Sequence, residues 1–329
     1  MDYRRLGRTG LKVSALCLGT MTFRWTSSEQ QSFQVLDRAW DAGINFIDTA
    51  DVYSRWAPGN SGGVAERIIG QWLRTKPREQ IVIATKVRGR MWDGPNGEGL
   101  SRAHIMRAVE DSLKRLQTDF IDLYQIHWPD WDTPLDETLR ALDDLVSSGK
   151  VRYIGASNHA AWLLMKTLWI CDQNGFVRFE TIQPHYNLIN RGEVEPELAA
   201  VCIDQGIGMI PYSPLAGGFL TGKYTRDQTP DSARLAQQSR SSQYEAYASE
   251  QNFMILDALR EMGEARGKSV TQMALGWMLT QPFVTSPIVG ANTVEQLDES
   301  LGAADVRLTE DEMKRLDDLT GVDRNWFRR

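Results

Sequence analysis

The sequence predicts a single α/β domain over residues 1–329, a (β/α)8 barrel of the TIM type with an N-terminal β-hairpin and a C-terminal helix. Eight short apolar segments alternate with amphipathic helical segments, and no linker divides the chain into halves. The Gly-x-Gly-x-x-Gly fingerprint of open dinucleotide-binding sheets is also missing after the first strand. These patterns favour a closed barrel over a doubly wound sheet.

The elements of the first half follow from local signals. Turn residues Gly7 and Gly10 predict the hairpin over residues 3–13, Gly43 ends the first helix, and Ser101 is a plausible N-cap for the third. We predict strands over residues 13–18, 44–48, 81–86 and 120–127, and helices over 29–42, 64–73 and 101–116.

The second half continues the alternation. Thr309 and Glu312 form a capping box that opens the last helix, and Leu308 and Met313 are placed as its hydrophobic staple. We predict strands over residues 151–155, 180–183, 208–212 and 285–289, and helices over 135–146, 163–170, 198–203, 250–266 and 270–280.

Composition narrows the function classes. The net charge of −6 argues against a general nucleic-acid binder, which needs a basic surface. Cys17, Cys171 and Cys202 form no Cys-x-x-Cys pair, which predicts reduced, mostly buried thiols in a cytoplasmic protein without a zinc site. No apolar run reaches about 18 residues, so we expect no membrane partner.

Ionisable side chains follow three neighbouring strands of the predicted barrel. Asp48 ends the second strand, Lys86 the third and His127 the fourth, and Tyr53 lies in the loop after Asp48. Alone, Asp48 could be a cap or turn residue and Tyr53 a half-buried aromatic. Because the active sites of such barrels collect at the C-terminal ends of the strands, we expect the four side chains to converge there.

These residue types suit the reduction of a carbonyl group. The ammonium of Lys86 stabilises a phenolate, so we expect it to lower the pKa of Tyr53. A buried lysine keeps its charge only with a partner, which Asp48 can be. His127 can donate a hydrogen bond to an oxygen that becomes negative as a hydride reaches the adjacent carbon.

The set resembles the catalytic tetrad of the aldo-keto reductases. The likeness covers nearly the full chain, including the hairpin sequence of residues 5–14 and the run Asp-Thr-Ala-Asp-Val-Tyr over 48–53. It implies that Tyr53 is the general acid/base, that Lys86 tunes it, that Asp48 holds Lys86, and that His127 orients and polarises the carbonyl. The implied enzyme is an oxidoreductase that transfers a hydride reversibly between NADP(H) and a small aldehyde or ketone, or the corresponding alcohol.

The same resemblance implies the residues that bind the cofactor. Ser157, Asn158 and Gln183 match residues that hydrogen-bond the nicotinamide carboxamide, and Tyr212 matches an aromatic that stacks on the nicotinamide ring. Ser157 and Asn158 could instead cap the following helix. The implied set is Thr20, Met21, Asp48, Ser157, Asn158, Gln183, Tyr212, Ser213, Leu215, Gly217, Lys223, Arg234, Gly290, Asn292, Gln296 and Glu299.

The choice of nucleotide depends on two departures from the family pattern. Ser300 stands where many relatives have asparagine, and no basic residue follows Gly290 to bind a 2′-phosphate. The resemblance implies NADP(H), and these two departures weaken that preference and leave NAD(H) possible. Lys223 and Arg234 could be surface charges in place of phosphate partners.

The glycine-rich stretch over residues 217–223 fits the Gly-x-x-x-x-Gly-Lys spacing of a P-loop. Tyr224 replaces the Ser or Thr that would hold magnesium, and a polar loop follows, so a role over a dinucleotide's phosphates fits better. The polar segment over about residues 218–249 is too long for a plain connection and is interpreted as a cofactor clasp or lid.

Tryptophans mark the predicted substrate side. Trp25, Trp56, Trp92 and Trp128 lie in or next to loops at the barrel mouth and predict an aromatic pocket for a small carbonyl or alcohol. Trp92 or the nearby Trp131 could equally pack a loop against the barrel.

Two other function classes are weighed against this one. A sensor or regulatory subunit would bind NADP(H) with little turnover, because related barrels also serve in larger assemblies. A metal-dependent isomerase or lyase would need clustered carboxylate and histidine ligands where Tyr53 and Lys86 stand, so we predict no metal centre.

Overall fold

The computed structural model describes residues 1–226 and 245–321. Part of the predicted lid over residues 218–249 lies outside the described residues, and so does the predicted cofactor residue Arg234.

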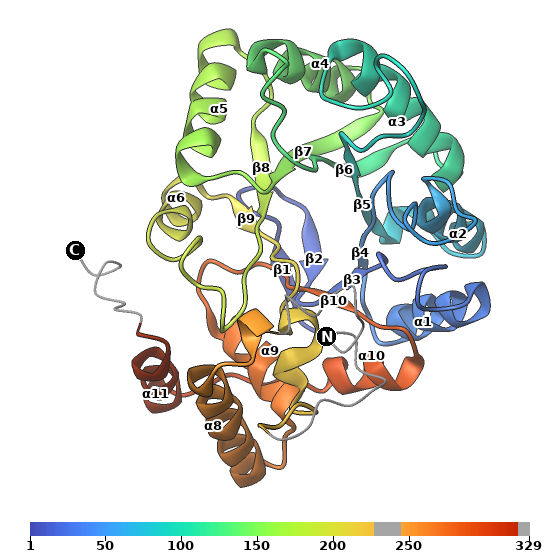
Figure 1. Cartoon of the computed structure of the whole chain (residues 1–329). Coiled ribbons are helices and arrows are strands. Elements are labelled where there is room, and N and C mark those ends of the chain that lie inside the picture. The colour runs from blue at the N-terminus through green and yellow to red at the C-terminus, as the bar shows by residue number, and fades with distance from the viewer. Residues whose placement is uncertain (227–244, 322–329) are drawn as a thin grey trace.

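The predicted barrel is confirmed. Eight parallel strands form one sheet in the order β10-β3-β4-β5-β6-β7-β8-β9 (Figure 1). The Thr285 amide donates to the Met209 carbonyl at 2.8 Å and the Ile288 amide to the Pro211 carbonyl at 2.9 Å, which joins the two ends of the sheet. The strands are β3 (Cys17–Gly19), β4 (Phe46–Asp48), β5 (Val82–Val87), β6 (Ile121–Ile126), β7 (Val151–Ser157), β8 (Phe179–Gln183), β9 (Gly208–Met209) and β10 (Ile288–Gly290).

Helices surround the strands, as a parallel barrel requires (Figure 1). They are α1 (Glu29–Asp41), α2 (Val64–Leu73), α3 (Arg102–Leu116), α4 (Leu135–Ser147), α5 (Ala161–Asn174), α6 (Leu198–Gln205), α8 (Glu250–Arg266), α9 (Val270–Thr280), α10 (Val294–Leu301) and α11 (Glu310–Thr320). The predicted Ser101 cap of α3 and the Thr309 capping box of α11 are both present. The eight-residue α10 is additional to the helices predicted from periodicity.

The predicted strand over residues 13–18 is wrong as one element. Its first part belongs to β2 (Lys12–Ser14), which pairs with β1 (Tyr3–Arg5), and its last part is β3 of the barrel. The Ser14 hydroxyl donates to the Leu16 carbonyl at 2.7 Å at the change of direction. A continuous apolar pattern therefore serves two different sheets.

The hairpin closes the N-terminal end of the barrel. Leu6 and Val13 of the hairpin pack with inward-facing strand residues such as Phe46, Ala84 and Leu123 in one buried cluster. Apolar side chains therefore fill that end, and the polar strand ends collect at the opposite mouth.

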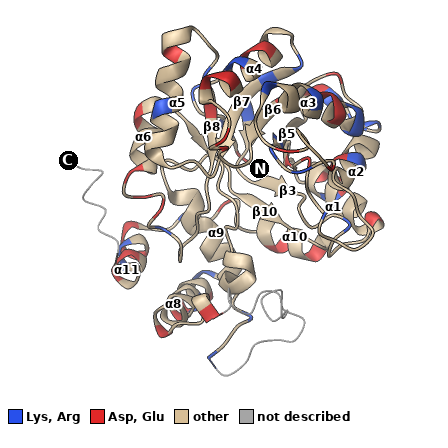
Figure 2. Cartoon of the chain, turned by 45° about the horizontal axis from the view of Figure 1, so that its top comes forward, with Lys and Arg blue, Asp and Glu red and all other residues tan. Residues whose placement is uncertain are grey.

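Charged residues lie mainly on the outer helices, with both signs interspersed (Figure 2). Among the described residues, no helix has both the length and the apolar character needed to cross a bilayer. Cys17, Cys171 and Cys202 are buried and unpaired, as predicted.

The contact between hairpin and barrel can be tested at Gly7. Its φ is +58°, and a Cβ there would lie 2.6 Å from the Glu180 carbonyl oxygen and 2.8 Å from that of Gly206. We expect Gly7→Ala to lower the free energy of unfolding by about 1–3 kcal/mol in urea titrations. Gly10→Ala is the matched control, because that site has nothing within 4 Å. Equal midpoints for the two variants would contradict this role.

Candidate active site

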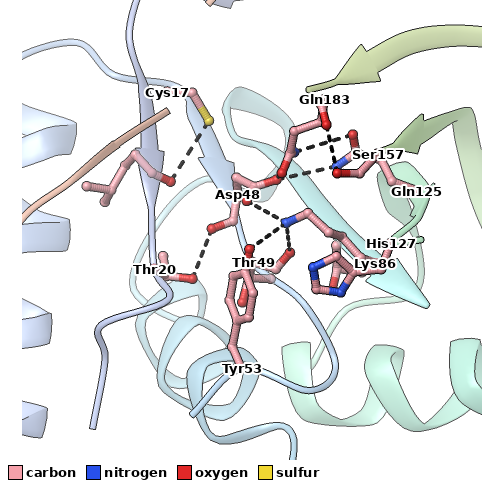
Figure 3. Close-up of polar contacts among 12 residues, drawn as sticks. Cys17, Thr20, Asp48, Thr49, Tyr53, Lys86, Gln125, His127, Ser157 and Gln183 are labelled. Atoms are coloured by element: carbon pink, nitrogen blue, oxygen red, sulfur yellow. Dashed lines mark hydrogen bonds and ion pairs between the residues drawn. The ribbon is translucent and has the colours of Figure 1, made fainter. Parts of the chain in front are cut away.

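The four predicted side chains meet around the ammonium of Lys86 (Figure 3). Lys86 Nζ donates to Asp48 Oδ1 at 2.6 Å, to the Thr49 carbonyl at 2.8 Å and to the Tyr53 hydroxyl oxygen at 2.9 Å. The rings of Tyr53 and His127 lie 5.8 Å apart between centroids. The convergence expected from the strand ends is therefore present.

Strand alternation explains the placement. Phe46 and Ala84 belong to the apolar cluster inside the barrel, and Asp48 and Lys86 follow them by two residues on the same faces. The register pairs Asp48 with Ala84 and Lys86 with Gln125. A polar layer thus rests directly on the apolar interior of the barrel.

The ion pair between Lys86 and Asp48 is buried, with side-chain exposures of 0% and 2%. Burial alone would lower the pKa of Lys86, but the charge of Asp48 and the oxygen of Tyr53 outweigh it and raise that pKa above its usual value. The ammonium therefore stays protonated at neutral pH, as expected from the sequence.

Tyr53 departs from the expectation. Burial raises the pKa of its phenol to about 12, and the opposing effect of Lys86 is smaller. Because Lys86 donates to the phenol oxygen, the hydroxyl proton of Tyr53 has to point to another acceptor. The arrangement holds a neutral phenol whose own proton is free for donation.

His127 is also neutral. Burial, followed by the charges of Lys86 and Arg88, lowers its pKa well below the usual value. Its ring stacks on Trp128 with centroids 3.7 Å apart, and its Nδ1 is buried without a hydrogen-bond partner among the described residues. A neutral imidazole in this position can act as a hydrogen-bond donor to a ligand oxygen.

Two glutamine amides complete the layer around Asp48. Gln183 Nε2 donates to Asp48 Oδ2 at 2.8 Å, and Gln125 Nε2 approaches the same oxygen at 3.4 Å. Gln183 was among the predicted residues, but Gln125 was missed. The signal for it was the alternation of Leu123, Gln125 and His127 on one face of β6.

The residues predicted to hold a carboxamide follow β7 and β8. Asn158, with φ +58°, donates from Nδ2 to the His127 carbonyl at 2.9 Å, and its Oδ1 accepts from the Tyr212 hydroxyl at 2.9 Å. Ser157 Oγ donates to the Gln183 carbonyl at 2.7 Å. One face of Tyr212 stacks on His185, with centroids 5.2 Å apart. Thr20 directly follows β3, which pairs with β4, and its Oγ1 donates to the Asp48 carbonyl at 2.9 Å. Met21, the next residue, is half-buried.

The predicted phosphate loop begins at Ser213 and Leu215. Three consecutive residues have left-handed backbone conformations: Ala216 at +49°, Gly217 at +65° and Gly218 at +100°. The Lys223 ammonium would lie 3.4 Å from a Cβ on Gly218. Successive backbone N–H groups in a turn can form an anion-binding concavity, so this loop is suited to an anion. Tyr224 is buried and stacks on Phe219, as a core residue does.

The predicted adenosine-phosphate residues lie where β10 leads into α10, starting at Gly290. The Asn292 amide donates to Gln296 Oε1 at 2.8 Å, and Thr26 donates to Asn292 Oδ1 at 2.8 Å. Glu299 instead accepts from Ser269, the N-cap of α9. The buried Ser300 donates to the Gln296 carbonyl at 3.2 Å.

Three of the four predicted pocket tryptophans gather near Tyr53 and His127. Trp56 lies 6.3 Å from Tyr53 and 5.5 Å from Trp25 between ring centroids, and Trp128 stacks on His127. The structure does not bring Trp92 to this group: its ring packs 5.0 Å from His104, and Arg107 lies over it at 4.6 Å.

The comparisons with known proteins agree with this geometry. The sequence model of the Aldo/keto reductase family matches residues 15–320. The chain belongs to the aldo/keto reductase family. It is 40% identical over 325 residues to the uncharacterized oxidoreductase YrpG of Bacillus subtilis, covering 97% of this chain and 96% of the relative. It is 37% identical to the versiconal hemiacetal acetate reductase of Aspergillus parasiticus, covering 97% of this chain and 96% of that protein.

Another relative of similar identity has a name that describes a different role. The probable voltage-gated potassium channel subunit beta of Arabidopsis thaliana is 35% identical over 311 residues, covering 93% of this chain and 92% of that protein. Aldo/keto reductases are oxidoreductases that use nicotinamide cofactors on small carbonyl compounds.

In residues 1–226 and 245–321, no group of three or more His, Cys, Asp or Glu side chains is placed to hold a metal ion.

Behind the tetrad lies a buried polar cluster that the sequence analysis missed. Glu66 accepts from Thr85 Oγ1 at 2.7 Å and from Arg115 Nε at 2.6 Å. Asp51 is fully buried beside this group, and no side chain among the described residues donates a hydrogen bond to its carboxyl oxygens. Burial, followed by the charge of Glu66, raises the pKa of Asp51 well above its usual value. The only signal in the sequence was a glutamate on an otherwise apolar face of α2.

The raised pKa of Asp51 predicts a pH-dependent cost to stability. A folded-state pKa above the unfolded value of about 3.9 means that stability is lost as pH rises from that value through the folded pKa. We expect Asp51→Asn to raise the urea midpoint at pH 8 relative to the parent protein, with the difference shrinking towards about pH 4. The exposed Asp93→Asn is the control. A difference that does not change with pH would contradict this interpretation.

Proposed function

We propose that this protein reduces small aldehydes and ketones with NADPH and catalyses the reverse oxidation of the alcohols. The observation that carries the proposal is that the Lys86 ammonium donates hydrogen bonds to both Asp48 and the Tyr53 oxygen. This contact orients a phenol proton in a buried site beside a neutral imidazole. Carbonyl reduction needs a proton donor and a hydrogen-bond donor at the carbonyl oxygen, and the phenol and the imidazole can supply them.

In the proposed mechanism, Tyr53 transfers its proton to the carbonyl oxygen as that oxygen gains negative charge. Bound NADPH would supply the hydride to the carbonyl carbon. The ammonium of Lys86 stabilises the phenolate that remains, and Asp48 keeps Lys86 charged. His127 donates a hydrogen bond to the same oxygen and fixes its position. In alcohol oxidation the phenolate accepts the proton.

The cofactor proposal rests on residues that fit a dinucleotide. Ser157, Asn158 and Gln183 present amide and hydroxyl groups at the strand ends, and Tyr212 offers the ring face that does not stack on His185. The left-handed turn at Gly217 and Lys223 suits the pyrophosphate. Asn292 and Gln296 lie where the adenosine end would extend. A cytoplasmic location is part of the same proposal.

Replacing Tyr53 tests the proton donor. We expect Tyr53→Phe to lower kcat for NADPH-dependent aldehyde reduction by about 10²- to 10⁴-fold, because the general acid is lost. The Kd for NADPH, measured by cofactor fluorescence, should change little. Tyr3→Phe is the control, since this exposed tyrosine lies at the other end of the barrel. Turnover of Tyr53→Phe at the parent rate would refute the assignment.

The relative named as a potassium channel subunit supports a second candidate, a cofactor-sensing subunit with little turnover. Titration with NADPH and with NADH, followed by a screen of carbonyls and alcohols in both directions, separates the two functions. We expect NADPH to bind more tightly than NADH and several aldehydes to be reduced. Tight NADPH binding with negligible turnover of every compound would favour the sensor.

A further inference from the structure

Arg88 carries a charge at the barrel mouth that the tetrad does not use. It follows β5 directly, two residues after Lys86, and its side chain is half-buried. Its Nε is buried and has no hydrogen-bond partner among the described residues. A buried donor without a partner costs free energy, which a bound acceptor would recover.

The backbone places Arg88 between the two loops that carry the acid and the imidazole. The His127 amide donates to the Val87 carbonyl at 3.0 Å, so His127 and Arg88 extend neighbouring strands. On the other side, a Cβ on Gly89 would lie 2.6 Å from Val52, the neighbour of Tyr53. The charge of Arg88 also contributes to the lowered pKa of His127, after burial and Lys86.

The conformation of Arg88 is strained. Its φ of +120° lies in the region that favours glycine. The Gly99 amide donates a hydrogen bond to the Arg88 carbonyl at 3.1 Å. Such strain persists where the surrounding structure fixes it, and it concentrates at functional sites. A glycine would relieve the strain, so the arginine side chain itself is the feature that needs an explanation.

The charge of Arg88 contributes to lowering the pKa of Asp130, but no hydrogen bond or ion pair joins the two side chains among the described residues. Asp130 is the nearby carboxylate, and its oxygens accept from the Leu100 amide, the Asp132 amide and the Thr133 hydroxyl. Arg90, two residues on, forms an ion pair with Glu98. In the part of the chain that the structure describes, no ion pair involves Arg88. An unpaired guanidinium next to His127 is suited to an anion on the substrate, since its fork of donors matches carboxylate and phosphate oxygens.

We propose that Arg88 determines substrate specificity by binding an anionic group, a carboxylate or a phosphate, of the carbonyl compound. The inference rests on the proposed reductase function. The carbonyl lies at Tyr53 and His127, the anionic group at Arg88, and the aromatic wall of Trp56 and Trp128 contacts the apolar part of the substrate.

Two matched substrate pairs test the proposal with NADPH. One pair is 4-carboxybenzaldehyde and 4-methylbenzaldehyde, and the other is glyceraldehyde 3-phosphate and glyceraldehyde. The measured quantity is the ratio of kcat/KM for the anionic compound to that for the neutral one. We expect Arg88→Met to lower this ratio at least about tenfold for one pair, as loss of a charge-assisted hydrogen bond predicts. The pair that responds identifies carboxylate or phosphate.

The matched control is Arg90→Met, which removes a charge from the same loop and should leave both ratios within about twofold of the parent values. Arg88→Lys keeps the charge without the fork, and it should give intermediate ratios even if Arg88→Met fails to fold. Unchanged ratios in both Arg88 variants would overturn the proposal while leaving the reductase function intact. Failure to reduce any neutral aldehyde would overturn the reductase function itself.

Discussion

The buried ammonium of Lys86 is the constraint on which the site depends. Removing such an ion from water costs several kcal/mol, so every neighbouring group has to compensate it. Asp48 supplies the opposite charge, and the Thr49 carbonyl and the Tyr53 oxygen accept the other two hydrogen bonds of the ammonium. Gln183 donates a hydrogen bond to the second oxygen of Asp48. The loop from Asp48 to Tyr53 is therefore fixed by its three contacts with one lysine.

The barrel makes that arrangement possible by separating its two ends. The hairpin fills the N-terminal end with apolar side chains, and the inward faces of the strands change from apolar to polar one layer below the mouth. Two residues at the mouth have strained backbones. Arg88 and Asn158 both have positive φ angles, and each directly follows the C-terminal end of a strand. The rigid interior holds these conformations in place.

Burial also sets the protonation states at the mouth. The phenol of Tyr53 and the imidazole of His127 are both neutral because desolvation dominates their pKa values. Charge remains where it is paired, as in Lys86 with Asp48, and at the half-buried Arg88, which follows β5. In the proposed reaction, the neutral phenol next to a fixed cation loses its proton only when a stronger base forms beside it, and a carbonyl oxygen becomes such a base during reduction.

The sequence by itself determined the barrel and the grouping of the four side chains at its mouth. Strand and helix periodicity and capping are local patterns, and the C-terminal ends of parallel strands have to meet, so Asp48, Lys86 and His127 could be grouped before any coordinates. The helix over Val64–Leu73 and the Thr309 cap were predicted for the same reason.

Only the tertiary structure decided the properties that depend on burial and on contacts between distant residues. The bond from Gln183 to Asp48 spans 135 residues, and Asp51 meets Glu66 and Arg115 only when α2 and α3 pack together. The sequence indicated that Lys86 would lower the pKa of Tyr53, but desolvation reversed the shift. The strand over residues 13–18 was predicted wrongly, and two positions were left open for Trp92. The reason is the same in both cases, because a one-dimensional pattern does not show which surface covers a side chain.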